Sequence, residues 1–444
     1  MEMHEFIDAL LRAAEENGIS PAEVYCSEDD SFSARARDGA VDSYEVSATR
    51  GLSLRGSVEG KMGFASTEAF DEDAIAFLIR AVRESAALNE AEDQDEIYAG
   101  DEKYPTLEAM PDDLDQVSAG EKLQLALRAD AAARASDPRI TQTEGASVST
   151  HQVRVMLQNS WGLKLENTRK MYVAYSLPIA KEGDSTATGF SLACGKMLKE
   201  LDPEALGKKA AADTLAQLHA EPVPSGEYRI IFRYDAMQSL LQTFSGIFSA
   251  ENAQQKMSLL AGREGQEIAA PAVSITDDPL RRDGAASSPF DGEGSATFSK
   301  AVVKNGVLMT LLHNRRTAAK QGVRTTGNAR RGGGMHVAPT NFFIEPGEKS
   351  LPDLLRDMGE GLLITDVSGL HAGANPYSGD FSLLSRGFVV RGGELAEPVE
   401  RITVAGNFYQ LLKSVRAVGS DLEFSGSPIG CPSVDAGTMS VSGK

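Results

Sequence analysis

The sequence predicts an α+β fold in which two similar helix–strands–helix units precede a β-rich, glycine-rich C-terminal domain. A helical pattern, several short alternating segments and a second helical pattern occur twice within the first 220 residues. Pro222 and Pro224 then mark a boundary, after which glycines and short strand-like runs dominate. We therefore expect units at residues 1–100 and 112–220, followed by a domain at 225–444.

The first unit opens with an amphipathic helix that ends at Gly18. Its apolar face comprises Phe6, Ile7, Leu10, Leu11 and Ala14. Four short alternating segments at 24–27, 31–37, 41–49 and 52–58 predict strands. The Asp38-Gly39 pair between two of them is typical of a hairpin turn. A second helix is expected over residues 71–88.

An acidic segment separates the two units. Between residues 84 and 115 the chain carries twelve acidic residues and one basic residue, Lys103. This composition favours a solvated linker. An acidic docking strip is the alternative interpretation.

The second unit repeats the pattern of the first about 110 residues later. Helices are expected over 121–135 and 203–219, with strand-like segments between 140 and 191. The strings RGLSLR at 50–55 and WGLKLE at 161–166 are alike. We interpret the repetition as a structural duplication.

The third unit has a different pattern, with one more helix over 234–249 and then short strands. The strands are expected at 297–303, 306–312, 341–344 and 386–391. Asn305-Gly306 and Gly392-Gly393 are candidate hairpin turns. Glycines at this density indicate a compact, mainly β domain.

The charge of the chain argues against nucleic acid as its main ligand. The 444 residues carry 44 Lys+Arg and 64 Asp+Glu, for a net charge of −20, which would repel a phosphate backbone. No apolar run approaches the roughly 18 residues that span a bilayer. The N-terminus reads as an amphipathic helix and not as a signal peptide. Together with three widely spaced cysteines and no CxxC, these features predict a cytoplasmic protein.

The familiar catalytic constellations are absent from the sequence. No two of the six histidines lie within ten residues of each other, so HExxH, HExxxH and HxH motifs do not occur. GxSxG and the glycine-rich phosphate loops are also missing. A zinc site assembled from distant residues stays open as an alternative. Its candidate ligands are His313, His336, His371 and Cys431.

Two pairs of carboxylates stand close together in the third unit, namely Asp277-Asp278 and Asp291 with Glu293. Paired acids can bind a cation or exchange protons with a substrate. Their positions before proline and glycine fit turn formation equally well.

The C-terminal unit contains nine short motifs in a characteristic order. They are DDP (277–279), FDGEG (290–294), NGVL (305–308), LLHNRRTA (311–318), TTGNA (325–329), PTNFFIEPG (339–347), SGDFS (378–382), TVAGN (403–407) and SVSG (440–443). Together they resemble the TldD/PmbA family, whose members were once called modulators of DNA gyrase. The resemblance covers nearly the whole chain and is strongest over residues 226–443.

That resemblance implies a heterodimeric zinc metalloprotease. In the family, the TldD-type subunit carries an HExxxH helix, and the TldE/PmbA-type subunit lacks the metal ligands. The matching helix here, residues 233–251, has no histidine, and the stretch matching the family's metal cysteine, 418–422, has no cysteine. Cys431 lies in a different motif, and we do not transfer the metal role to it. The resemblance therefore implies a TldE/PmbA-type chain without a catalytic residue.

The same resemblance implies how the chain works. It would bind no metal or cofactor itself and would be inactive alone. Zinc would sit on a TldD-type HExxxH partner, in a heterodimer that degrades or processes unfolded or modified peptides. A homodimer is expected where that partner is missing, with no membrane and no direct nucleic-acid contact.

Nine residues are candidates for the substrate chamber or the subunit interface. They are Asp277, Asp278, Asp291, Glu293, Thr326, Gly327, Asn328, Asn341 and Asp380. A structural role in turns is the competing interpretation for each. Two other functions stay open for the chain: an autonomous metal-dependent peptidase with atypical ligands, or a binding protein that modulates a topoisomerase or a toxin–antitoxin system.

Overall fold

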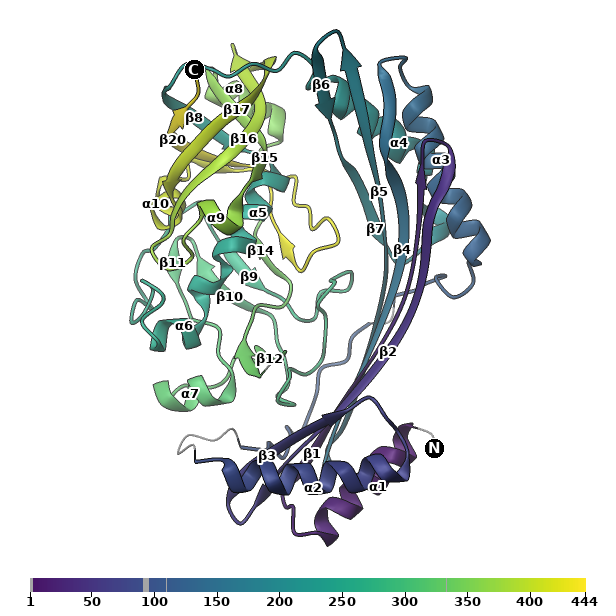
Figure 1. Cartoon of the computed structure of the whole chain (residues 1–444). Helices are drawn as coiled ribbons and strands as arrows, with labels where there is room; N and C mark the ends of the chain where they lie inside the picture. The colour runs from purple at the N-terminus through teal and green to yellow at the C-terminus, as the bar shows by residue number, and fades with distance from the viewer. Residues whose placement is uncertain (1–2, 91–95, 109, 333) are drawn as a thin grey trace.

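The computed structural model describes residues 3–90, 96–108, 110–332 and 334–444. Figure 1 shows a long curved sheet with helices near both of its ends, and beside it a domain of shorter strands formed by the second half of the chain. The mixed α+β class predicted from the sequence is confirmed. No helix within the described ranges combines the length and the apolar character needed to cross a membrane.

The long sheet contains strands from both predicted N-terminal units. Its order is β3-β2-β1-β4-β5-β6, and β7 also pairs with β5. The central pair, β1 and β4, consists of the first strand of each unit, and each unit then extends outwards. The strands are β1 (Ala22–Arg37), β2 (Ala40–Val58), β3 (Lys61–Thr67), β4 (Ile140–Asn159), β5 (Lys164–Glu182), β6 (Ser185–Thr188) and β7 (Ser191–Gly195).

Two pairs of helices cover this sheet near opposite ends (Figure 1). Helices α1 (Met3–Glu16) and α2 (Glu72–Leu88) enclose an apolar core against β1–β3. Helices α3 (Ala119–Ala135) and α4 (Pro203–Leu215), with the short η1 (Leu198–Glu200), pack on the other part of the sheet. Ser118 and Glu121 form a capping box that fixes the start of α3.

The C-terminal domain contains a five-stranded sheet, a six-stranded sheet and a separate two-stranded hairpin. The two larger sheets and helix α5 share one continuous apolar core, in which Phe244 stacks on Phe408 at 4.7 Å between ring centroids. The domain's elements are β8 (Gly226–Phe232), α5 (Tyr234–Phe244), η2 (Ser245–Phe248), α6 (Ala250–Gln254), β9 (Ile275–Asp277), β10 (Lys300–Lys304), β11 (Val307–Leu308), α7 (Arg315–Gln321), β12 (Ala329–Arg331), β13 (Met335–Val337), β14 (Phe342–Ile344), α8 (Leu351–Met358), β15 (Gly361–Ser368), α9 (Leu370–Gly373), β16 (Asp380–Arg391), β17 (Glu394–Asn407), α10 (Phe408–Ser414), β18 (Ala417–Val418), β19 (Ile429–Gly430) and β20 (Val434–Ser442).

The acidic segment between the two units is not a solvated linker along its whole length. The Tyr104 hydroxyl donates to the carbonyl of Gly294 at 2.7 Å, and Asp101 accepts the N–H of Ala296 at the same distance. The prediction of a solvated linker is wrong at these residues, because Tyr104 and Asp101 form hydrogen bonds with the C-terminal domain. Residues 91–95 of the acidic segment lie outside the described ranges.

A buried carboxylate joins the long sheet to the C-terminal domain. Glu23 on β1 is fully buried and binds Arg55 of β2, with Nε 2.7 Å from Oε1. The same carboxylate also binds Arg331, which lies on β12 of the C-terminal domain. The Arg331 guanidinium also lies 4.6 Å from the centre of the Tyr25 ring. This acid thus adds a buried ionic contact between the two parts.

Candidate functional site

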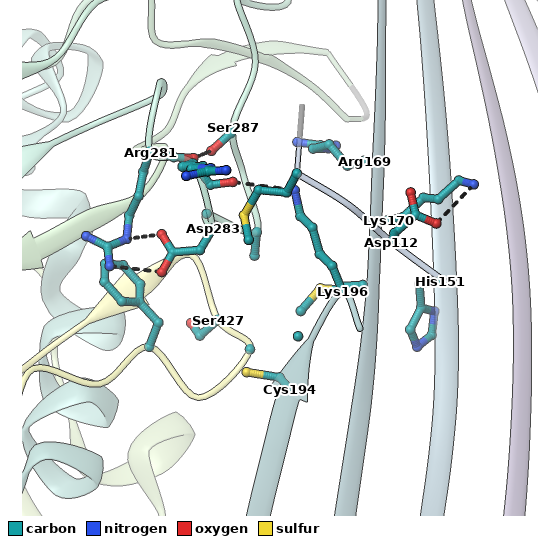
Figure 2. A pocket seen from close by; sticks show the side chains of 18 of the residues that line it. Asp112, His151, Arg169, Lys170, Cys194, Lys196, Arg281, Asp283, Ser287 and Ser427 are labelled. Atoms are coloured by element: carbon teal, nitrogen blue, oxygen red, sulfur yellow. Dashed lines mark hydrogen bonds and ion pairs between the residues drawn. The ribbon is translucent and has the colours of Figure 1, made fainter. Parts of the chain in front are cut away.

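A cavity of about 680 Å³ lies between the long sheet and the C-terminal domain. Strands β4, β5 and β7 contribute one wall, and two loops of the C-terminal domain contribute the other. Figure 2 shows Arg281 and Asp283 on the loop side, facing Cys194, Lys196 and His151 on the sheet side. The loops span residues 281–287 and 422–427.

Charged side chains from both walls line this cavity. On the loop side, Arg281 is paired with Asp283 at 2.8 Å and its guanidinium lies 4.4 Å from the centre of the Phe424 ring. On the sheet side, Lys170 contacts Asp112 at 3.5 Å. The lining therefore combines charged side chains with apolar ones such as Met171 and Phe424, a mixture that suits a peptide.

Helix α5 lies directly behind the loop wall. The Gln238 amide on this helix donates to the carbonyl of Phe424 at 2.8 Å, and Phe424 lines the cavity. The helix that the family resemblance matches to the HExxxH helix of TldD-type chains thus lies behind the loop that lines the cavity. On this helix the present chain carries the Gln238 amide, which holds the loop of residues 422–427 in place.

Three of the predicted site residues belong to one buried polar network behind the cavity. Asp277 is fully buried and accepts hydrogen bonds from Lys300 at 2.9 Å and from the Asn328 amide at 2.8 Å. It also accepts the N–H of Thr340 at 2.6 Å. Lys300 donates to the carbonyl of Thr326 at 2.7 Å, and the chain turns at Gly327 with φ of 68°. Every charge in this network has a partner, so it holds the fold together.

Two further candidates shape the loop that lines the cavity. The amide of Asn341, which is fully buried, donates to the carbonyl of Asp278 at 2.7 Å and to the Ser287 hydroxyl at 2.9 Å. Its oxygen accepts the N–H of Ala286 at 2.9 Å. Asn341 and Asp278 therefore fix the loop from behind without lining the cavity themselves.

Asp291 and Glu293 organise the turn that meets the acidic segment. Asp291 accepts the N–H groups of Glu293, Ser295 and Ala329 at 2.9–3.1 Å. Burial nevertheless raises the pKa of Asp291 to about 6. Glu293 accepts the N–H of Arg315 at the start of α7. Both acids act as caps for backbone N–H groups.

Asp291 gives a testable pH dependence. Its folded-state pKa lies above the unfolded value of about 3.9, so the folded chain retains the proton up to a higher pH. Stability is therefore lost as the pH rises from about 4 to about 6, by up to about 3 kcal/mol. In Asp291→Asn this loss is removed. We expect urea unfolding between pH 4 and 7 to show that the free energy of unfolding of the variant rises relative to that of the wild type by this amount. A difference between the two proteins that does not change with pH would contradict the raised pKa of Asp291.

Asp380 lies apart from the other candidates. It is exposed at the start of β16, where it accepts hydrogen bonds from Ser378 and the Asn407 amide at 2.8 Å each. The structure therefore brings eight of the nine predicted residues into neighbouring turns and leaves Asp380 outside. None of the nine lines the cavity directly, and their role in a chamber or an interface stays a prediction.

The residues of this chain do not fit a zinc ion. Within the described ranges no group of three or more His, Cys, Asp or Glu side chains is arranged to hold a metal. Cys431 is fully buried, where burial raises the pKa of its thiol, and His371 is exposed. His313 is buried with its Nδ1 3.3 Å from the Thr317 hydroxyl. Zinc favours ionised cysteine and converging imidazoles, and these side chains offer neither.

The sequence did not single out the side chains that line the cavity. They lie on β5, β7 and two distant loops, and the most prominent are Arg169, Lys170, Cys194, Lys196, Arg281 and Glu423. One signal was available, because Arg169-Lys170 and Arg281-Arg282 are basic pairs in an acidic chain.

Comparison with domain families gives matches along most of the chain. Residues 22–86 match the family described as PmbA/TldA metallopeptidase domain 1, and residues 112–218 match its central domain. Residues 225–443 match the PmbA/TldA metallopeptidase C-terminal domain.

Full-length relatives and solved structures agree with these matches. Metalloprotease PmbA of Escherichia coli O157:H7 is 30% identical over 95% of this chain and 92% of its own length. The Metalloprotease PmbA homolog of Haemophilus influenzae is 30% identical over 100% and 96%, respectively. A crystal structure from Thermotoga maritima, described as a modulator of a DNA gyrase, has a TM-score of 0.92 at 32% identity and covers 99% of this chain and 100% of its own. TldE from Thermococcus kodakarensis shares the fold, with a TM-score of 0.88 at 20% identity over 99% and 100%.

Proposed function

Because this chain belongs to the PmbA/TldD metallopeptidase family, we propose that it is the non-catalytic subunit of a two-chain zinc peptidase. The zinc is bound by a TldD-type partner with an HExxxH helix. The present chain encloses the peptide substrate and completes the chamber.

The composition of α5 is the observation that carries this proposal. The helix lies behind the loop that lines the cavity, and its buried Gln238 donates to the Phe424 carbonyl of that loop. Residues 233–251 contain no histidine. A peptidase centre needs a metal or another activated group to generate its nucleophile. A chain with a cavity and no metal-binding cluster among its described residues fits a binding and enclosing role.

An open strand edge supports the presence of a partner subunit. Strand β3 pairs with residues 52–58 of β2 only, so among the described residues no strand covers the edge of residues 40–51. Tyr44 and Val46 on this edge are 70% and 69% exposed. A long uncovered edge with apolar side chains is a template for strand pairing. In the sheet order this edge strand, β2, is separated from β5 by β1 and β4.

Substituting this edge is expected to weaken the complex. Tyr44→Lys together with Val46→Lys places two charges on the exposed edge, where they cost little in the isolated chain. We expect the dissociation constant for the HExxxH partner to rise tenfold or more, because buried aromatic contacts dominate such interfaces. Leu395→Lys, at a half-exposed position on β17, is the matched control and should leave the affinity unchanged. Equal affinity of the edge variant and the wild type would remove this surface from the proposal.

Zinc content provides the direct test of the division of labour. The chain and its HExxxH-bearing relative are purified separately and together by gel filtration, and metal is measured in each peak. We expect stoichiometric zinc in the partner and in the complex, and none above background in the present chain. Stoichiometric zinc in the isolated chain would contradict the proposal.

A further inference from the structure

The cavity is more basic than the chain that forms it. Five Lys or Arg side chains and four Asp or Glu side chains line it, whereas the whole chain has 44 and 64. Three of these cations are neutralised within the cavity lining. They are Arg281 with Asp283, Lys170 with Asp112, and Arg282 with Glu108. Two cations, Arg169 and Lys196, have no carboxylate partner among the described residues.

Arg169 is the first of these cations. Its guanidinium lies on β5, is half-buried, and takes part in no hydrogen bond or ion pair within the described ranges. The charged or titratable groups that act on it are Tyr25 and a second cation, Arg330. Burial lowers the pKa of Arg169, which reflects the cost of holding this charge away from water. An uncompensated cation of this kind is costly to the fold, and an anion would relieve that cost.

Lys196 lies beside Arg169. Lys196 directly follows Gly195, the last residue of β7, which pairs with Tyr172 of β5, three positions from Arg169. Both side chains line the cavity, and Figure 2 shows Lys196 extending from the sheet side towards the Arg281 loop. Its ammonium donates only a long hydrogen bond of 3.4 Å, to the carbonyl of Arg282. Two of its three donor positions are therefore available.

We propose that Arg169 and Lys196 form an anchor for a carboxylate of the bound peptide. This inference rests on the proposed peptide-enclosing function and adds a specificity to it. A guanidinium offers a planar fork that matches a carboxylate, and an ammonium beside it adds a second charge-assisted bond. The carboxylate of Glu423, which has no cationic partner among the described residues, lines the loop side of the same cavity, so the anion binds on the sheet side. Within the bound peptide, this carboxylate can be the C-terminal carboxylate or that of an Asp or Glu side chain, because both have the same chemistry.

The test is calorimetric binding of acetylated five-residue alanine peptides to the isolated full-length chain. The first has a free C-terminal carboxylate, the second is amidated, and the third is amidated with a central glutamate. We expect the first or the third to bind at least tenfold more tightly than the second, and the preference to weaken as salt is added. The tighter of the two identifies the source of the carboxylate. Equal binding of all three peptides, or no binding at millimolar concentration, would overturn the inference.

Variants then locate the anchor. Arg169→Gln and Lys196→Gln are each expected to lower the carboxylate preference about tenfold, which is the lower end of the discrimination that one charge-assisted hydrogen bond provides. Arg12→Gln on α1 and Lys304→Gln on β10 are exposed controls of the same chemistry, and both should retain the full preference. Retention of the preference in both cavity variants would refute the anchor. Two separate positions keep the test valid if one variant fails to fold.

These results separate the anchor from the proposed function. The binding assay needs neither partner nor zinc, and its readout is the ratio between charged and amidated peptides. A mixture that hydrolyses peptide with no such ratio would refute the anchor alone. A clear ratio without partner-dependent hydrolysis would refute the non-catalytic subunit role and leave the anchor standing.

Discussion

Replacing Glu23 with alanine is expected to lower the free energy of unfolding by about 3–5 kcal/mol, the range for breaking a buried ion pair from one side. The carboxylate is fully buried and holds the nearly buried side chains of Arg55 and Arg331. Removing it leaves both guanidinium groups without this partner, next to each other at the junction of the two parts. Urea unfolding followed by tryptophan fluorescence and circular dichroism measures the loss.

The same variant should also loosen the cavity, because Arg331 belongs to the C-terminal domain and Glu23 to the sheet. We expect a larger radius of gyration in small-angle X-ray scattering and faster proteolysis between the two parts. Glu84→Ala is the matched control: its ion pair with Arg80 on α2 is highly exposed and should contribute little. Comparable losses in the two variants would contradict the role assigned to Glu23.

Replacing Asp277 with asparagine is expected to cost a similar amount, about 3–5 kcal/mol. The variant leaves Lys300 charged and almost fully buried, facing an amide in place of a carboxylate. The double variant Asp277→Asn, Lys300→Met removes the charge as well. It should be more stable than Asp277→Asn alone, because no uncompensated ammonium remains.

A double-mutant cycle over these two positions measures their coupling. Additive losses from the two substitutions would mean that the ion pair does not contribute, and that Asp277 acts only through its bonds to Thr340 and Asn328.

Local features of the fold could be predicted because neighbouring residues determine them. The Asp38-Gly39 turn has φ angles of 50° and 83°, and Asn305-Gly306 has 48° and 83°, as the residue types indicated. The expected helix over 71–88 begins after the cap Asp71. In each case the residue types that predict the turn or the helix start lie within a few residues of that turn or helix start.

Strand length was predicted less well. Segments 24–27 and 31–37 are parts of one strand, β1, because Glu28 in the gap is accommodated by an ion pair with Arg154 of β4 at 3.3 Å. Polar residues in the middle of a strand resemble a turn when the neighbouring strand is unknown. The role of Tyr104 was not predicted either, because its hydrogen bond reaches Gly294, a residue 190 positions away.

The candidate site depended on contacts that no sequence pattern carries. The motif residues, such as Asp277 and Asn341, are distinctive because they fix turns, and the structure places them behind the cavity wall. The cavity itself joins three strands of the first half to two loops of the second half. Arg169 resembles an ordinary strand residue in the sequence, and only the packing of the two parts half-buries it with no carboxylate partner in the part of the chain that the structure describes.

Peptide hydrolysis by the chain alone and in mixture with its HExxxH-bearing relative tests the central claim most directly. Unfolded casein and a short modified peptide serve as substrates. We expect no hydrolysis by this chain, hydrolysis by the mixture, and loss of that activity when a chelator removes zinc. Hydrolysis by the purified chain at the rate of the mixture would contradict this expectation, and His313, His336, His371 and Cys431 would then be the first residues to replace.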